Sequence, residues 1–117
     1  DDSALQKFSN IRNNISHLDL SRTKVTDRGM GVLRSFYNLT WLSLRMTSVG
    51  DDALTALNKL PSLWYINLVG TEVTDKGIQT LASIPSLKEI YLWNSKVSED
   101  GAAKLQAALP NAKIIYR

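Results

Sequence analysis

Residues 63–86 read LWYINLVGTEVTDKGIQTLASIPS, and the chain repeats this pattern every 24 residues. Further copies begin at Ile15, Leu39 and Leu87, and the last copy is one residue longer than the others. The four copies share the frame LxxLxLxxTxVTDxGxxxLxxLPx, with an aliphatic residue at places 1, 4, 6, 11 and 19 of every copy. A fixed period of this length is typical of a protein built from stacked structural repeats.

Each copy predicts a short strand followed by a helix. Leu or Ile at places 4 and 6, with outward residues between them, gives the alternation of a strand. A hydroxyl residue followed by an acid, as in Thr74-Asp75, then marks a helix start, since the hydroxyl can cap free N–H groups and the helix dipole favours the acid. Apolar residues such as Ile78 and Leu81 recur at helical spacing, and a proline such as Pro85 follows the helix.

One strand–helix unit cannot bury its apolar edge alone, so the units are expected to stack. The predicted fold is α/β: a short curved solenoid with a parallel sheet on the concave side and helices on the convex side. The repeats span 15–38, 39–62, 63–86 and 87–111, followed by a terminal strand within 112–117. We expect the hydroxyls at place 9 to satisfy backbone groups at the bend after each strand. We expect Gly29, Gly77 and Gly101 to let the helix and strand layers approach closely.

The two ends of the chain differ from the full repeats. Residues 1–14 carry Leu5, Phe8 and Ile11 at helical spacing, which predicts a capping helix from a degenerate half repeat. The terminal strand is expected to point Ile115 inward. No helix follows that strand, which leaves a sheet edge open to pair with another chain, so a homodimer through this edge is one predicted assembly.

Composition excludes several classes of function. The chain has no cysteine, so it has no disulfide, thiolate nucleophile, Cys-based zinc site or haem-attachment motif, and its one histidine argues against a His-rich metal site. The sequence therefore predicts neither a cofactor nor a metal. Fourteen basic against eleven acidic residues give a net charge of +3 without a basic run, which disfavours nucleic acid. The longest apolar run is too short for membrane insertion.

The repeats resemble bacterial leucine-rich repeat proteins of the ribonuclease-inhibitor-like strand-and-helix subtype, over about Ile15 to Arg117. The motif VTDxG, present as Val25–Gly29 and Val73–Gly77, carries this resemblance. The ending, with Tyr91-Leu92-Trp93 and Leu109-Pro110-Asn111, is similar to the C-terminal repeat segment of envelope-anchored, c-type-cytochrome-like proteins. That second resemblance implies a location on the extracytoplasmic side of a bacterial envelope.

The outward strand positions gather aromatic side chains. Place 3 of the repeats gives His17, Trp41, Tyr65, Glu89 and Ile114, and place 5 gives Asp19, Ser43, Asn67, Tyr91 and Tyr116. Six of the nine aromatic residues, including all three tryptophans, fall at positions predicted to face solvent. Exposed aromatic patches mark interaction surfaces, and Trp, Tyr and Arg dominate binding hot spots. The predicted ligand-binding residues are Trp41, Arg45, Trp64, Tyr65, Tyr91, Trp93 and Tyr116.

These residues predict a non-enzymatic recognition module that binds a protein or peptide partner through its aromatic concave face. Two alternatives remain open. Flat aromatic rings also stack on sugars, which would make the chain a glycan-binding envelope module. The rings could instead pack only on one another, in a structural appendage of a larger membrane-anchored protein. His17, Asp19 and Ser43 bring the three residue types of a hydrolase triad to one neighbourhood, but an open sheet offers neither an oxyanion hole nor a water-excluding pocket.

Overall fold

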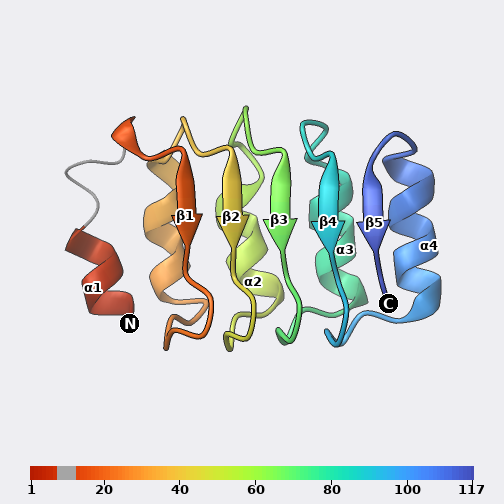
Figure 1. The fold of residues 1–117 in the computed structure, drawn as a ribbon, viewed down its shortest axis with the longest axis horizontal. Helices are drawn as coiled ribbons and strands as arrows, with labels where there is room; N and C mark the ends of the chain where they lie inside the picture. The colour runs from red at the N-terminus through yellow and green to blue at the C-terminus, as the bar shows by residue number, and fades with distance from the viewer. Residues whose placement is uncertain (8–12) are drawn as a thin grey trace.

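The computed structural model describes residues 1–7 and 13–117, and within them five parallel strands form one sheet in the order β1-β2-β3-β4-β5. The helical segments form a second layer behind the sheet; α1 precedes the first strand, and every connection between successive strands runs through this layer (Figure 1). The strands are β1 (His17–Asp19), β2 (Trp41–Ser43), β3 (Tyr65–Asn67), β4 (Glu89–Tyr91) and β5 (Lys113–Ile115). The helical segments are α1 (Asp2–Gln6), η2 (Gly29–Ser35), α2 (Asp51–Leu54), η3 (Thr55–Leu57), α3 (Asp75–Ala82) and α4 (Glu99–Ala108). The predicted α/β solenoid is confirmed.

The core lies between the two layers and follows the repeat frame. The middle residues of the central strands, Leu42, Ile66 and Ile90, are fully buried, as are the residues two places later, Leu44, Leu68 and Leu92. Each strand residue pairs with the residue 24 positions away in the next strand, as Leu42 does with Ile66. The aliphatic frame therefore stacks in columns, and this burial is the main favourable term in forming the solenoid.

A left-handed residue turns the chain after each of the first four strands. Arg22, Met46, Gly70 and Asn94, all at place 8, have φ values of 59°, 58°, 70° and 58°. The hydroxyl of the next residue donates to the carbonyl three positions earlier, as in Thr47 Oγ1 to Leu44 O at 2.7 Å. Equivalent bonds are made by Thr23, Thr71 and Ser95. The predicted role of the place-9 hydroxyls is confirmed.

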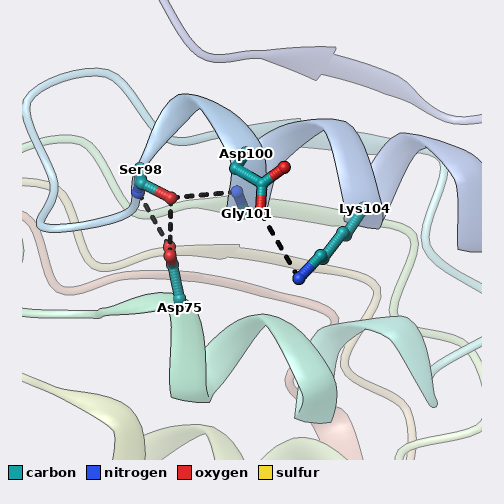
Figure 2. Close-up of polar contacts among 5 residues, drawn as sticks. All are labelled: Asp75, Ser98, Asp100, Gly101 and Lys104. Atoms are coloured by element: carbon teal, nitrogen blue, oxygen red, sulfur yellow. Dashed lines mark hydrogen bonds and ion pairs between the residues drawn. The ribbon is translucent and has the colours of Figure 1, made fainter.

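Aspartates at the helix starts join successive repeats. Asp75 accepts hydrogen bonds from the N–H of Ser98 at 2.7 Å and from its hydroxyl at 2.5 Å, one repeat further on. Figure 2 shows this pair and the Ser98 hydroxyl that caps the N–H of Gly101 at 3.0 Å. Asp51 binds Thr74, and Asp2 binds Thr26, in the same two-bond arrangement. We call these contacts carboxylate bridges. Through them the acid joins two repeats, in addition to compensating the dipole of its own helix.

The carboxylate bridges also explain the glycines, for which the sequence interpretation was wrong. A Cβ at Gly101 would overlap Asp75 Oδ1, and a Cβ at Gly77 would lie 2.5 Å from Asp51 Oδ1 and 2.9 Å from Leu54 Cδ1. Gly29 faces Asp2 in the same way. The close approach is therefore between one helical segment and the carboxylate that precedes it by one repeat, not between helix and strand layers.

The helical layer is less regular than predicted in the first two repeats. The first repeat forms a 3₁₀ segment, η2, and Thr26 does not cap it, because η2 begins after Arg28 without a side-chain cap. The second repeat forms a single turn of α-helix, α2, followed by the 3₁₀ segment η3. Within residues 1–7 and 13–117, only α3 and α4 are longer α-helices, and both have the predicted hydroxyl cap, from Thr74 and Ser98.

The N-terminal segment begins with a short helix. Leu5 of α1 is 2% exposed and belongs to the core, and α1 packs against η2. Phe8 and Ile11, which the sequence assigns to the same capping helix, lie outside the described residues. Among the residues that the structure describes, no helix is long and apolar enough to cross a membrane.

The last strand differs by one residue from the sequence prediction. Lys113 pairs with Glu89, Ile114 with Ile90 and Ile115 with Tyr91, so the 24-residue spacing continues through β5. Ile114, not Ile115, therefore takes the inward place. Tyr116 follows the strand, packs against the core, and donates its hydroxyl to Val97 O at 3.1 Å. The placing of Ile114 at place 3 and of Tyr116 at place 5 was wrong, because the extra residue of the last copy does not precede its strand.

Candidate functional site

The exposed side of the five-stranded sheet, which we call the sheet face, carries the candidate site. It is the side turned away from the helical layer, toward the viewer in Figure 1. Strands alternate their side chains, so the residues flanking each buried central residue point to this side. The burial pattern agrees: in β3 and β4 the outer residues are half-buried and the central residue is buried. The sheet face is therefore set by the same alternation that builds the core.

Aromatic rings form a stack across the first three strands. The rings of Trp41 and Tyr65, directly paired in the sheet, are parallel with centroids 4.6 Å apart. His17 stacks on the other side of Trp41 at 5.4 Å. Tyr91 lies 5.6 Å from Tyr65 with its ring tilted by 47°. The rings thus stand beside one another, and the Trp41 ring has an aromatic neighbour on each of its two faces.

Two tryptophans lie at the margins of this stack and are more exposed. Trp64 precedes β3, is 40% exposed and meets Tyr65 edge to face at 5.7 Å. Trp93 follows β4 and is 54% exposed. Large aromatic side chains normally lie inside a folded domain, so exposed aromatic surface of this kind is unusual.

Polar groups complete the sheet face near β1 and β2. The carboxylate of Asp19 accepts a hydrogen bond from the Ser21 N–H at 2.9 Å, and hydrogen bonding by Ser21 lowers the pKa of Asp19. Asp19 is therefore an anion at neutral pH. Burial raises the pKa of Tyr65, so its phenol stays protonated and can donate a hydrogen bond. Arg45, half-buried two places after Ser43, adds a cation to the same region.

The His, Asp and Ser of the triad considered above have other partners. His17 stacks on Trp41, Asp19 binds the Ser21 N–H, and the Ser43 hydroxyl lies 2.7 Å from the Ser21 hydroxyl. Ser43 is also only 3% exposed. A serine nucleophile needs access to substrate and a hydrogen bond to its base, and Ser43 has neither in this arrangement.

The structure brings together most of the predicted binding residues. Trp41, Tyr65 and Tyr91 are successive rings of the stack, and Trp64 meets the Tyr65 ring. Arg45 and Trp93 each follow two places after the last residue of their strand, where alternation points a side chain to the same side. Tyr116 does not belong to the sheet face, and Ile115 takes its place beside Tyr91. Carrying the 24-residue period from Glu89 to Lys113 would have found this register. The sequence analysis did not single out Met46, an apolar side chain that is 46% exposed just after β2. The residue type at this left-handed place differs in each repeat, so no shared pattern marks it.

Comparisons with known proteins agree with this fold. The family description "Leucine Rich repeat" matches residues 13–33. The structure is similar to Leiomodin-1 Actin-Binding Site 2, with a TM-score of 0.74 and 16% identity, over 98% of this chain and 78% of that one. It is also similar to an internalin C2 from Listeria monocytogenes, with a TM-score of 0.59 and 18% identity, over 97% of this chain and 61% of that one.

A second internalin of Listeria monocytogenes, internalin F, matches with a TM-score of 0.50 and 13% identity, over 92% of this chain and 43% of that one. The chain thus spans less than two thirds of the length of either internalin. No curated protein sequence matches the chain. The leucine-rich repeat match and the solved structures agree with the 24-residue period, the parallel sheet and the helical layer: the chain has the fold of a leucine-rich repeat protein.

Proposed function

We propose that the chain is a non-enzymatic recognition module that binds a protein or peptide partner on its sheet face. The observation that carries the proposal is the contiguous group of Trp41, Tyr65 and Tyr91, flanked by the exposed Trp64 and Trp93. Repeat solenoids use such extended faces for binding, and Trp and Tyr supply large contact areas at a small entropic cost. One structural neighbour carries an actin-binding site by its name, which supports a protein ligand as the class.

The stacking geometry favours a polypeptide over a sugar. A sugar ring stacks on a free aromatic face, but His17 and Tyr65 lie on the two faces of Trp41. The stack instead offers ring edges, the indole N–H and the protonated Tyr65 phenol, which suit peptide groups. The glycan alternative rests on Trp93, which is 54% exposed and has the most open indole on this side.

We also propose the ribonuclease-inhibitor-like subtype and a bacterial envelope setting. The helices α3 and α4, of 8 and 10 residues, support the subtype, since they give the later repeats a true α-helical layer. The bacterial internalins among the structural neighbours support the setting. A role beside a cytochrome-like domain would belong to a protein in which this chain is one part.

The test selects peptides from a phage-displayed random library on the native chain and measures their affinity by calorimetry. The variant Trp41→Ala/Tyr65→Ala/Trp93→Ala is expected to lose at least about 100-fold in affinity, because aromatic hot spots dominate such interfaces. A matched control replaces three exposed residues of the helical layer, Thr55, Gln79 and Lys104, by alanine and is expected to bind like the native chain.

Trp93→Ala alone separates binding from folding. The stacked rings of Trp41 and Tyr65 stabilise the sheet by about 0.5–1.5 kcal/mol, whereas Trp93 stacks on no aromatic ring of the described part of the chain. Trp93→Ala should therefore have the same unfolding temperature as the native chain but a lower affinity for the selected peptides. Equal affinity of all variants, or selection on a glycan array in place of peptides, would contradict the proposal. If no peptide is selected and the variant Trp41→Ala/Tyr65→Ala/Trp93→Ala is less stable than the native chain, the structural appendage is favoured.

A further inference from the structure

The acidic residues of the chain are segregated toward one edge of the solenoid, whereas cations occur at both edges. We call the edge where helical segments end and strands begin, at the top of Figure 1, the helix-to-strand edge. No Asp or Glu occurs in segments 28–50, 53–71, 76–88 or 101–117, which contain the four connections at this edge. Most acidic residues instead follow the strands or start the helices at the opposite edge; the two that lie within strands are Asp19, the last residue of β1, and Glu89, the first residue of β4.

Each of the four connections carries an exposed cation. Arg34 lies in the last turn of η2, Lys59 follows η3, Lys88 precedes β4 and Lys113 begins β5, and all four are exposed. The helix dipole favours acids at helix starts and a cation such as Arg34 at a helix end. It does not account for Lys88 and Lys113, which stand at the starts of strands. The cationic edge therefore calls for another explanation.

Exposed aromatic residues and clefts lie among these cations. Tyr37 is 55% exposed and Trp64 is 40% exposed, both in connections of this edge. A cleft of about 260 Å³ is lined by Arg34, Tyr37 and Lys59, together with Ala56 and Asn58. A second cleft, of about 210 Å³, includes Lys88, Pro85, Pro110 and Asn111 in its lining. Cations, aromatic rings and clefts of side-chain size are thus combined on one edge.

The edge keeps its positive charge in the folded chain. Glu89, half-buried at the start of β4, pairs in the sheet with Lys113, and this one carboxylate stands against the four cations of the edge. The ion pairs found among residues 1–7 and 13–117, Lys104 with Asp100 and Arg117 with Glu99, both use acids at the start of α4. The potential of this edge is therefore available to a ligand.

We propose that the helix-to-strand edge binds an acidic polypeptide segment. The cations belong to four successive helix-to-strand connections, whose strands lie about 4.8 Å apart in a sheet. The clefts beside them can receive individual side chains. A lipid surface or a nucleic acid strand would favour a denser cationic patch. The site uses none of Trp41, Tyr65, Tyr91 and Trp93 and shares only Trp64 with the sheet face. Because Trp64 is unchanged in the variants of both tests, the two proposals are tested separately.

The test uses charge reversal with a matched control. Lys59→Glu/Lys88→Glu/Lys113→Glu reverses three of the four edge cations. Lys24→Glu/Lys76→Glu/Lys96→Glu makes the same change in net charge with exposed lysines of the opposite edge. The probe is a fluorescein-labelled twelve-residue peptide rich in Glu with two Phe, followed by fluorescence anisotropy. The edge variant should bind about tenfold more weakly than the native chain, and the control less than about threefold more weakly.

Three results would overturn the proposal. They are the absence of binding by the native chain, equal weakening in both charge variants, or equal binding of the peptide with Gln in place of Glu. Vesicles of phosphatidylcholine with phosphatidylserine and a single-stranded oligothymidylate serve as competing probes; tighter binding of either would replace the polypeptide assignment. Circular dichroism confirms that each variant is folded. The variant Trp41→Ala/Tyr65→Ala/Trp93→Ala should retain the Glu-rich peptide, which keeps this test separate from that of the sheet face.

Discussion

The two halves of the solenoid share one sequence frame but differ in their helical layer. In the C-terminal half, α3 and α4 are α-helices of 8 and 10 residues, each started by a hydroxyl cap. In the N-terminal half, η2 is a 3₁₀ segment and α2 is a single turn, and neither has a side-chain cap. The strands differ much less, since all five have three residues in continuous register. The sheet is therefore set by the apolar frame, and the helical layer by finer contacts.

The carboxylate bridges account for part of this difference. The bridges to Thr74 and Ser98 each use an N–H and a hydroxyl, and both hydroxyls also cap a helix. In the second repeat, Gly50 replaces the hydroxyl residue, so Asp27 accepts only the Gly50 N–H, at 2.5 Å. The segment that follows, α2, is the short one. A missing hydroxyl thus removes both an inter-repeat bond and a helix cap.

The largest predicted effect comes from filling the space beside a bridge in the regular half. Gly77→Ala should lose about 1–2 kcal/mol of unfolding free energy, because the new Cβ would meet Asp51 Oδ1, Leu54 and Val73. The gain in helix propensity offsets only part of this cost. Urea denaturation followed by circular dichroism measures the change.

Gly31→Ala is the control in the irregular half, because no atom of another described segment lies within 4 Å of the place that a Cβ would take there. It should be neutral or gain up to about 1 kcal/mol through the unfolded state. If both substitutions stabilise the chain equally, the close approach of the carboxylate at Gly77 does not constrain the fold.

A smaller effect is expected from supplying the missing hydroxyl. Gly50→Thr should gain about 0.5–1.5 kcal/mol, because Gly50 has extended φ and ψ of −128° and −154°, and a Cβ there would lie 3.4 Å from Asp27 Oδ2. The new hydroxyl can then donate to Asp27, as Thr74 does to Asp51. Thermal unfolding should rise by about 2–8 °C. Gly50→Ala adds the Cβ without the hydroxyl, so a Thr variant no more stable than the Ala variant would show that the hydroxyl contributes nothing.

Much of the fold could be predicted from the sequence, because the apolar frame is visible in every copy. The period, the parallel sheet and the place-9 hydroxyl bonds of Thr47 and Thr71 all follow from local pattern. The carboxylate bridges could not be predicted, since Asp75 beside a helix start is explained equally well by the dipole within its own repeat. Its partner, Ser98, lies 23 positions away and has no separate signal.

The candidate site was predictable as a group of residues but not as a geometry. Alternation placed Trp41, Tyr65 and Tyr91 on one side of the sheet. Whether the rings would lie flat or stack depends on side-chain rotamers, which no single repeat specifies. Tyr116 was misplaced because the last copy was counted with its extra residue ahead of the strand, whereas the hydrogen bond from Lys113 N to Lys88 O at 2.7 Å keeps the 24-residue register.

The smallest predicted effect is a pH dependence of the bridges. Hydrogen bonds from the Ser98 hydroxyl and N–H lower the pKa of Asp75 below its unfolded value of 3.8, and those from the Thr26 hydroxyl and N–H lower that of Asp2. A depressed folded-state pKa means that the bridge contributes stability above the unfolded pKa and loses it as pH falls through the folded pKa. Thermal unfolding between about pH 5 and 2 should therefore change less with pH in Asp75→Asn than in the native chain. Asp2→Asn should show the same flattening at the first repeat, and parallel curves for the native chain and both variants would exclude the bridges as the acid-sensitive contacts.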